Sequence, residues 1–352
     1  MLQIPTLTKE FSRQHETFYK KLCLDPSLKN TQCTNDTAPV LDWDTDFKNP
    51  WRRFADIIMV VTYNNPLYGN IGAIELLYRP FFANIIYCGP EELESRDNLY
   101  NVTFIKYEQY PPPMPPGSSM YKCSALAMDK YRSYNGVIKG YLLTADDALS
   151  MIPNLAYLPK HQIWYFDKSR LNYYDVSTKK NSTPWHWWKR QHNNMKSLIT
   201  ALQSQPHLQD CRKKLEKFTG APNRVLGRVY ADFFYVPSHM SERFMEIVNI
   251  TIEHMVYLEI AVPTILLCMH NDTKPWTTAT NDREFPRVSP WFQFTSPEGK
   301  WNTTYLHPMK WSCLNESESC RDLYCNTILP LFHNKGIENN PNCNLSKVKQ
   351  KN

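Results

Sequence analysis

The chain contains 352 residues, with 40 Lys and Arg against 34 Asp and Glu, so its formal net charge is +6. Single hydrophobic cores rarely grow beyond roughly 250–300 residues, and this length therefore favours one large α/β domain with extensions. The basic residues form no continuous tract along the sequence, which argues against a nucleic-acid-binding protein. Mild basicity suits an anionic small substrate, although a solvated surface explains it equally well.

The N-terminal half begins with a polar segment and continues with alternating strands and helices. Residues 1–50 show no sustained period, so we interpret them as a stem or a surface-wrapping segment. Residues 56–63 form an uninterrupted β-branched run, typical of a strand covered on both faces. A helix is predicted over residues 71–81 and a second strand over 84–89. This strand, helix and strand order favours a parallel pair.

The middle of the chain contains a proline-rich stretch, a helix and a strand that ends in acidic residues. Residues 107–119 hold several prolines, which exclude a helix or a central strand and predict an exposed loop. A helical pattern follows over residues 120–135. It leads into an apolar strand that ends at Asp146 and Asp147.

The second half contains further strands and long amphipathic helices. Strands are predicted over residues 161–167 and 227–237, and a helix interrupted by a proline is predicted between residues 192 and 220. Residues 241–269 are predicted to form a helix, a turn and a second buried segment. From residue 271 onward the chain is rich in tryptophan, proline and cysteine, which indicates an extension cross-linked by disulfides.

Cysteines and glycosylation sequences together indicate the secretory lumen. The ten cysteines include no two Cys-x-x-Cys motifs at zinc spacing, so disulfides are more plausible than metal staples. Asn-x-Ser/Thr sequences exceed the roughly three or four expected from composition. They begin at Asn35, Asn101, Asn181, Asn249, Asn271, Asn302, Asn315 and Asn344. We therefore expect the protein in the Golgi or ER lumen, or secreted.

The sequence contains no segment of its own that would direct it to a membrane. Residues 1–16 lack an apolar run of signal-peptide length, and the longest apolar run, residues 260–269, is too short to span a bilayer. We expect membrane contact only through an anchor absent from this chain.

Asp146 and Asp147 lie where a sheet presents its ligands. In doubly wound sheets, ligands gather at the carboxyl ends of the strands. Adjacent residues of a strand point to opposite faces, so at most one of the two carboxylates points at a given ligand. We expect this one to be Asp147, which precedes Ala148 and Leu149, and we expect it to hold a hard cation such as Mg²⁺ or Mn²⁺. The alternative is that the two aspartates only cap a helix that begins directly after them, because Asp is a favoured N-cap residue.

Three segments in the same order resemble the nucleotide-sugar-dependent glycosyltransferases of GT-A fold, most nearly the exostosin-type and STELLO-like families. The segment IIMVVTYNN (57–65) resembles the first strand, which ends at the uridine pocket. The segment YLLTADDAL (141–149) resembles the Asp-x-Asp metal motif. Residues 228–244 and YLEIAVPTILL (257–267) resemble the acceptor-side strand and the acidic residue after it. The resemblance spans about residues 55–270.

The resemblance implies a Rossmann-like GT-A fold, an α/β fold with a mixed central sheet flanked by helices. The domains would be the N-terminal stem (1–50), a catalytic domain (51–270) and the Cys-rich C-terminal extension (271–352). The donor would be a nucleotide sugar, UDP-linked, and Asp147 would hold the Mn²⁺ or Mg²⁺ that bridges its diphosphate. By this resemblance, Thr62, Tyr63, Asn64 and Asp146 would bind the donor. Outside the range of the resemblance, we expect basic help for the diphosphate from His307 or Lys310. Ala145 replaces the first aspartate of the motif, which removes one carboxylate.

The resemblance also implies catalytic carboxylates on the acceptor side. Glu259 stands where the family places its catalytic acid, and Asp232 would lie near the acceptor. When a sugar–phosphate bond breaks, a cation stabilises the leaving diphosphate and a carboxylate accepts the proton of the attacking hydroxyl. Asp147 would hold this cation, and Glu259 would be this carboxylate. Glu259 has an alternative role as a helix-end carboxylate bonded to backbone. Aromatic side chains either stack on acceptor sugars or pack inside: Trp185, Trp187 and Trp188.

The sequence therefore predicts a metal-dependent glycosyltransferase that acts on a glycan or glycoprotein in the secretory pathway. A non-catalytic luminal protein of the same fold, which binds a glycan or a partner, is the first alternative, because fold does not fix activity. A glycoside hydrolase that uses Asp146 or Asp232 with Glu259 is the second.

Overall fold

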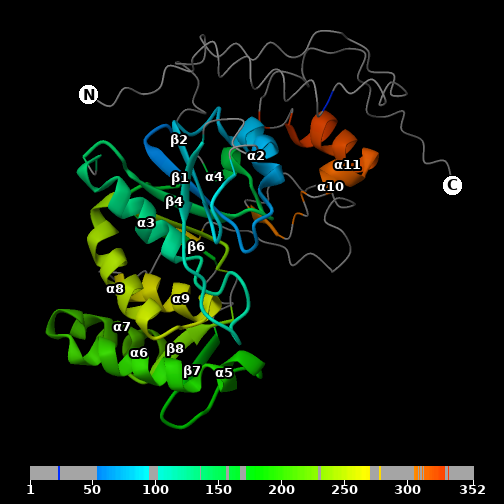
Figure 1. Cartoon of the computed structure of the whole chain (residues 1–352). Coiled ribbons are helices and arrows are strands. Elements are labelled where there is room, and N and C mark those ends of the chain that lie inside the picture. Colours follow the sequence, from blue (N-terminus) through cyan, green and yellow to red (C-terminus); the bar gives the residue numbers. More distant parts are fainter. Residues whose placement is uncertain are drawn as a thin grey trace.

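The central element of the protein, seen in a computed structural model, is a mixed sheet of seven strands in the order β10-β6-β9-β4-β1-β2-β3 (Figure 1). The structure describes residues 23, 54–94, 102–134, 136–155, 158–166, 172–228, 231–269, 277–278, 305–307, 309, 311, 313–329 and 332. The strands are β1 (Ile57–Thr62), β2 (Asn84–Gly89), β3 (Thr103–Lys106), β4 (Gly140–Ala145), β5 (Leu149–Ser150), β6 (Trp164–Tyr165), β7 (Asn172–Asp175), β8 (Arg224–Gly227), β9 (Phe233–Pro237), β10 (Thr277–Thr278) and β11 (Tyr305–Leu306). The helices are α2 (Ile71–Tyr78), α3 (Lys122–Lys130), α4 (Ile152–Leu155), α5 (His186–Arg190), α6 (His192–Ser204), α7 (Gln209–Thr219), α8 (Ser241–Glu253), α9 (Leu258–Met269), α10 (Cys313–Glu316) and α11 (Glu318–Leu323).

The register of the central strands decides where a ligand can meet the sheet. β1 runs parallel to β2 and to β4, with Thr62 opposite Ala145. β9 runs antiparallel to β4, with Phe233 opposite Thr144. The carboxyl ends of β1 and β4 therefore meet the beginning of β9 at one edge of the sheet. The predicted parallel pair of β1 and β2 and the predicted mixed α/β fold are confirmed.

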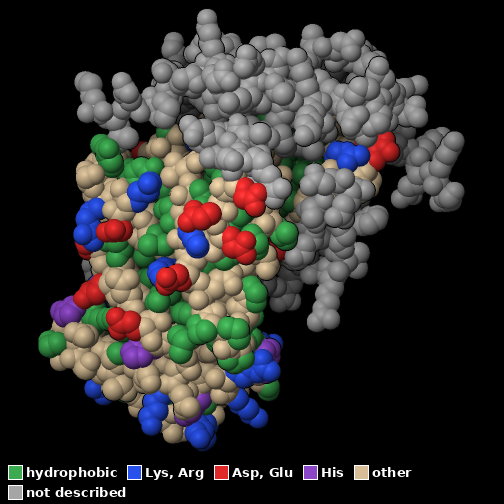
Figure 2. All heavy atoms as spheres, viewed as in Figure 1, with side chains coloured by type: hydrophobic (Ala, Val, Ile, Leu, Met, Phe, Trp, Pro, Cys, Tyr) green, Lys and Arg blue, Asp and Glu red, His purple; other side chains and the backbone are tan. Residues whose placement is uncertain are grey.

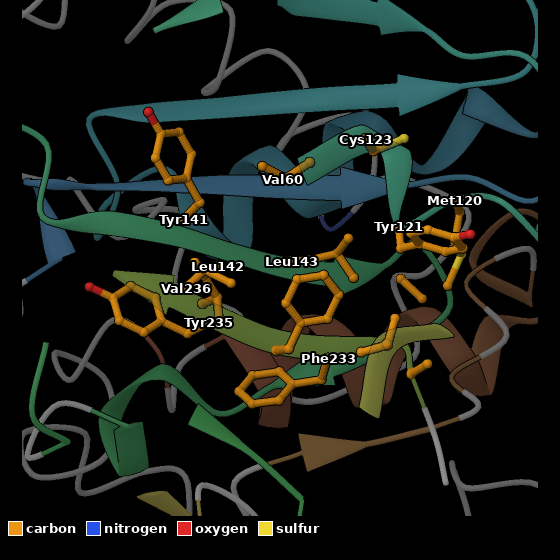
Figure 3. Packing of buried hydrophobic residues seen from close by; sticks show 14 of the residues in the cluster. Val60, Met120, Tyr121, Cys123, Tyr141, Leu142, Leu143, Phe233, Tyr235 and Val236 are labelled. Atoms are coloured by element: carbon orange, nitrogen blue, oxygen red, sulfur yellow. The ribbon is translucent and has the colours of Figure 1, made fainter. Parts of the chain in front are cut away.

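The core forms because the central strands are apolar on both faces. All six residues of β1 and all six of β4 are buried, as expected for strands covered on two sides. Leu143 of β4 and Phe233 and Val236 of β9 lie in the same core (Figure 3). Trp164 of β6 stacks on Tyr235, with ring centroids 4.0 Å apart. Helix α3 packs on β1, β4 and α8.

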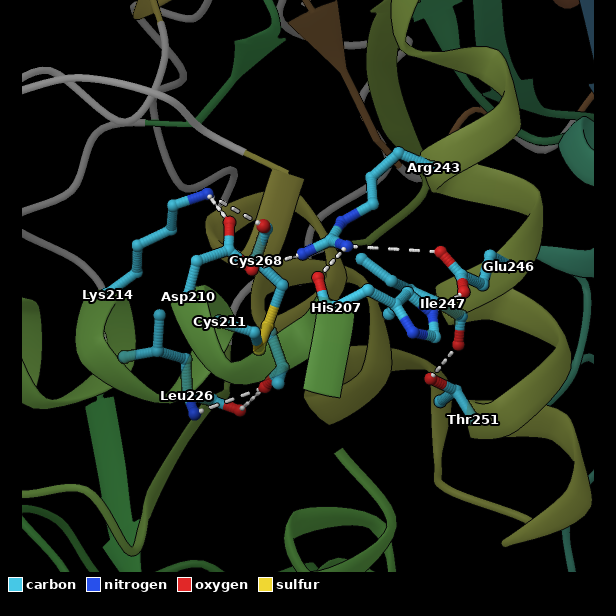
Figure 4. Close-up of a disulfide and its surroundings, with 11 residues drawn as sticks. His207, Asp210, Cys211, Lys214, Leu226, Arg243, Glu246, Ile247, Thr251 and Cys268 are labelled. Atoms are coloured by element: carbon cyan, nitrogen blue, oxygen red, sulfur yellow. Dashed lines mark hydrogen bonds and ion pairs between the residues drawn. A yellow bond between two sulfur atoms is a disulfide. The ribbon is translucent and has the colours of Figure 1, made fainter. Parts of the chain in front are cut away.

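Residues 172–227 form a second unit, which we call the helical lobe. It contains the two-stranded sheet of β7 and β8 together with α5, α6 and α7, and it occupies the lower end of the molecule in Figure 1. The predicted break between its long helices is confirmed, and α7 ends at Gly220, whose φ of 81° is left-handed. A disulfide from Cys211 of α7 to Cys268 of α9 ties the lobe to the rest of the protein (Figure 4).

Three other disulfides are present, and together with Cys211–Cys268 they confirm the prediction that the cysteines form disulfides. Cys88 at the end of β2 is bonded to Cys123 of α3. In the C-terminal part, Cys313 is bonded to Cys320, and Cys325 is bonded to the distant Cys23. Cys33 and Cys343 lie outside the described residues. No helix within the described ranges is long and apolar enough to cross a membrane.

The structure differs from the sequence-based elements in several places. The strand predicted over 227–237 is two strands in different sheets, because Arg228 has a φ of 62° and turns the chain out of β8. Strand β3 was missed, since it is short and only half-buried at the sheet edge. The proline-rich loop is exposed at 111–113 but buried from Gly117 onward. Residues after Asp147 form β5 rather than the alternative helix.

Candidate active site

Three chain segments meet at the carboxyl end of β4. The backbone N–H of Asp146 donates to the carbonyl of Thr62 at 2.9 Å, which extends the ladder between β1 and β4 by one residue. The N–H of Ala145 donates to the carbonyl of Asp232 at 2.9 Å, just before β9 begins. These bonds hold Asp147 and Asp232 side by side, although 85 positions separate them along the chain.

Asp146 and Asp147 form a turn directly after β4, closed by a hydrogen bond from the N–H of Ala148 to the carbonyl of Ala145 at 3.2 Å, and their side chains have different neighbours. Burial, followed by the charge of Asp146, raises the pKa of Tyr63 well above its ordinary value. The Asp146 carboxylate therefore lies on the side of β1 and its tyrosines. On the other side, Asp147 Oδ1 lies 3.1 Å from His307 Nε2. Only Asp147 of the pair faces Asp232 and His307.

A pairing of two very short strands brings His307 to this place. β5 begins two residues after Asp147, and β11 ends one residue before His307. The two strands pair antiparallel, with Leu306 opposite Leu149. The N–H of Met309 also donates to the carbonyl of Asp147. The segment expected to be a separate extension thus contributes a side chain to the site.

Asp147, Asp232, Glu259 and His307 form one group, which we call the acidic cluster. His307 Nε2 lies 4.0 Å from Asp232 Oδ2, and the Asp232 side chain is only 14% exposed. Burial raises the pKa of Asp232, the nearby His307 opposes this rise, and the charge of Asp147 adds to it.

Glu259 joins the cluster from the first turn of α9. Burial and, after it, the charge of Asp232 raise the pKa of Glu259 to about 8, while His307 and Arg228 oppose the rise. Such a pKa near neutrality is typical of a group that exchanges protons in a reaction.

Two tyrosines that the sequence did not single out complete the surroundings of the cluster. Burial raises the pKa of Tyr165, and the charges of Asp232 and Glu259 add to it. Burial and the charges of Glu259 and Asp232 likewise raise the pKa of Tyr257. In the sequence, the feature that could have pointed to Tyr257 is its position two residues before Glu259.

The turn after β1 is more closed than the sequence predicts. The side chains of Thr62 and Tyr63 are fully buried, and Tyr63 donates its hydroxyl to Asn70 Oδ1 at 2.7 Å. Both side chains therefore pack inside the protein. Asn64 differs, because its Oδ1 is buried with no hydrogen-bond partner among the described residues. Of the three expected base-binding side chains, Asn64 alone offers such an acceptor.

The three tryptophans have different environments. Trp188 is fully buried and stacks on Tyr174, with centroids 5.6 Å apart, so it packs inside. Trp187 is half-buried and stacks on Tyr257 at 4.4 Å. Trp185 is half-buried between Trp188 and Tyr257. Lys310, expected near the diphosphate, lies outside the described residues.

Potential metal ligands in the cluster are few. Within the part of the chain that the structure describes, no group of three or more His, Cys, Asp and Glu side chains is arranged to hold a metal ion. Asp147 and His307 are the two donors in direct contact. Any ion at this place would need further ligands from a bound diphosphate or from water.

Comparison with known proteins gives matches of one kind. The model of the family "STELLO glycosyltransferases" matches residues 28–221. The "Probable glycosyltransferase STELLO1" of Arabidopsis thaliana is 23% identical over 269 residues, which are 76% of this chain and 31% of that protein. The "Probable glycosyltransferase STELLO2" of the same plant is 24% identical over 222 residues, 62% of this chain and 26% of that protein. This chain therefore spans less than a third of the length of these relatives. No solved structure gives a significant match.

The matched range shows which part of the site the family model supports. Residues 28–221 include β1 and the Asp146–Asp147 pair, and they begin before the motifs that we compared. The range ends before Asp232, Glu259 and His307. These three residues are linked to the motif by the geometry of the acidic cluster.

Proposed function

The chain belongs to the STELLO glycosyltransferase family, and from this premise we propose that it transfers a sugar from a nucleotide-sugar donor to a hydroxyl group of a glycan or glycoprotein. The observation that carries the proposal is the acidic cluster at the carboxyl end of β4. It combines an Asp–His pair with the half-buried carboxyl of Glu259, whose pKa is about 8. These are the groups that the two halves of a glycosyl transfer require.

On the donor side, the chain must stabilise a leaving diphosphate. Asp147 offers a carboxylate oxygen, the donor that suits Mn²⁺ or Mg²⁺, and His307 offers an imidazole nitrogen, which suits transition-metal ions rather than Mg²⁺. The two donor atoms, Asp147 Oδ1 and His307 Nε2, lie 3.1 Å apart. Asp147 and His307 would therefore hold the ion. When bound, such an ion neutralises the charge that develops on the diphosphate.

On the acceptor side, Glu259 takes up the proton of the attacking hydroxyl. The acceptor oxygen forms a bond to the anomeric carbon, the bond from that carbon to the diphosphate breaks, and the electron pair leaves with the diphosphate. A base works best when its pKa lies near the working pH, and burial with the charge of Asp232 brings the pKa of Glu259 to about 8. Asp232 acts here by its charge.

At the turn after β1, Asn64 would recognise the base of the donor. Its buried Oδ1 accepts no hydrogen bond from the described residues, so a ring N–H of a base such as uracil would satisfy it. The backbone of the turn is already bonded, since the Asn64 carbonyl accepts from Gln109 Nε2 at 2.7 Å.

We place this reaction in the secretory lumen. Support comes from the disulfides that join distant segments and from the glycosylation sequences. Residues 51–270 would form the catalytic domain, and the C-terminal segment would complete it with His307.

The experiment is a donor assay on the full chain. UDP binding is measured by calorimetry with Mn²⁺ and with a chelator, and UDP release from a panel of UDP-sugars is followed in parallel. We expect binding that needs the ion and release from at least one sugar donor, with release lost in Glu259→Gln while UDP binding is kept. No binding of any nucleoside diphosphate would refute the proposal.

The replacement of the first motif aspartate by Ala145 favours one second candidate, a binding protein without turnover. It predicts UDP binding with no release from any donor, and the same UDP affinity in Asp147→Asn. The hydrolase alternative predicts turnover without nucleotide or metal. Asp146 is a poor partner for Glu259 in such a hydrolase, because it faces the tyrosines on the other side of β4.

A further inference from the structure

The charge of the protein is concentrated in the helical lobe. Residues 172–227 contain ten Lys and Arg and three Asp and Glu, which gives a net charge of +7. The rest of the chain contains 30 basic and 31 acidic residues, a net charge of −1. Basic residues that form no tract along the sequence thus gather in one unit of the fold. Figure 2 shows blue side chains along the lower end of the molecule, where this lobe lies.

Two of the three acidic residues in the lobe are already neutralised by partners. Asp175 lies 3.5 Å from Arg224, and Asp210 pairs with Lys214 at 2.7 Å and with Arg243 of α8 (Figure 4). Eight basic side chains of the lobe are exposed and have no ion pair among the described residues. They are Lys179, Lys180, Lys189, Arg190, Lys196, Arg212, Lys213 and Lys217. Their field attracts anions to this end of the protein.

A groove of about 570 Å³ lies on the same lobe. One wall is a face of α6 with residues at helical spacing, and the other is His254 at the end of α8. The lining residues are Asn193, Lys196, Ser197, Thr200, Ala201 and His254. Their hydroxyl, amide, imidazole and ammonium groups hydrogen-bond to sugar hydroxyls, and the ammonium also attracts a carboxylate or a sulfate.

The groove borders the turn that positions Glu259. Asn194 Nδ2 donates to the carbonyl of His254 at 2.9 Å. Gln191 Oε1 accepts from the N–H of Tyr257 at 3.0 Å. Glu259 lies five positions after His254, so their Cα atoms lie at most about 18 Å apart. This upper bound is within the length of a short oligosaccharide.

We propose that the groove and the exposed basic residues of the helical lobe bind an acidic glycan, whose sugars carry uronate or sulfate groups, and that this glycan is the acceptor. This inference rests on the proposed glycosyl transfer. A neutral glycan gains nothing from a lobe of charge +7, whereas an acidic one gains a salt-dependent attraction. A membrane surface fits less well, because none of the large exposed hydrophobic side chains of the described residues lies within 172–227.

The test measures binding to the full chain without nucleotide. The probes are an oligogalacturonide and a cello-oligosaccharide of equal length, and the variants are Lys196→Glu and, as a control, Lys106→Glu. Lys106 is also exposed but lies on β3, outside the lobe. We expect the acidic probe to bind more tightly, with an affinity that falls as salt rises. We expect Lys196→Glu to weaken it about tenfold and the control to leave it within about twofold.

Two results would overturn the inference. One is equal binding of both probes, or equal losses in the two variants. The other is stronger binding to vesicles of phosphatidylcholine and phosphatidylserine than to the oligogalacturonide, which would assign the lobe to a membrane. Because no nucleotide is present, these results are independent of the donor assay, and a negative donor assay would leave the glycan measurement intact. Once the donor assay has shown turnover, Lys196→Glu is expected to raise the KM for the acidic acceptor and to leave kcat unchanged. If the protein transfers sugar to no acidic glycan, the role of the glycan as acceptor is refuted.

Discussion

Glu259→Gln separates what the acidic cluster costs in stability from what it contributes to catalysis. The pKa of Glu259 rises from 4.5 to about 8 through burial and the charge of Asp232. In the folded protein the protonated form is favoured, so the contribution of Glu259 to stability is full below about pH 4.5 and is lost as the pH rises through about 8. At about 1.4 kcal/mol for each pH unit, the loss reaches about 5 kcal/mol.

The assay is urea unfolding of the wild type and the variant near pH 5 and near pH 9, on either side of the two pKa values. Glutamine cannot ionise, so Glu259→Gln escapes the loss. We expect the variant to gain several kcal/mol relative to the wild type between the two pH values, and to lose UDP release. Glu253→Gln, at an exposed position at the end of α8, is the matched control and should show no such gain.

An unfolding free energy with the same pH dependence in the wild type and Glu259→Gln would refute this reasoning. It would mean that Glu259 ionises in the folded protein as it does in water. The base assigned to the acceptor side would then already be charged at neutral pH.

Three further predictions test other parts of the site. Asp147→Asn should weaken Mn²⁺-dependent UDP binding in calorimetry by about tenfold or more, while Asp146→Asn, whose side chain faces away, should not; equal losses would contradict the assignment. Asp232→Asn should shift the ascending limb of the pH–rate profile to lower pH, because its charge raises the pKa of the base; an unshifted limb would contradict this. Gly117→Ala should lower the thermal midpoint, since Gly117 has a φ of 80° and a Cβ would lie 2.0 Å from Asn64 Oδ1, whereas Gly136→Ala, with open space around it, should not.

Local patterns made the central strands predictable. The β-branched run of β1 and the apolar run of β4 are uninterrupted, which is typical of strands buried on both faces. The end of α7 is predictable because glycine, here Gly220, commonly follows the last residue of a helix. The place of Asp147 at the end of β4 follows from the same pattern. Asp147 could be proposed from the sequence because it follows a strand that the sequence defines, whereas Glu259 could be proposed from the resemblance to a family.

Contacts between distant segments could not be read in this way. His307 reaches Asp147 through the pairing of β5 and β11, which have two residues each and no period of their own. The left-handed turn at Arg228 ends β8 early, and arginine gives no signal for it. The burial of Tyr63 depends on a bond to Asn70 that only the folded α2 provides.

The position of Asp232 bears on the missing aspartate at position 145. Ala145 lies inside the sheet, 2% exposed, and its N–H bonds to the carbonyl of Asp232. The antiparallel strand β9 thus begins with a carboxylate beside the motif, 4.0 Å from the imidazole that also meets Asp147. A negative charge absent from the motif is present in the fold, because a second strand supplies it. The departure at Ala145 is therefore weak evidence for a protein without turnover, and the donor assay on Asp147→Asn and Glu259→Gln decides the question.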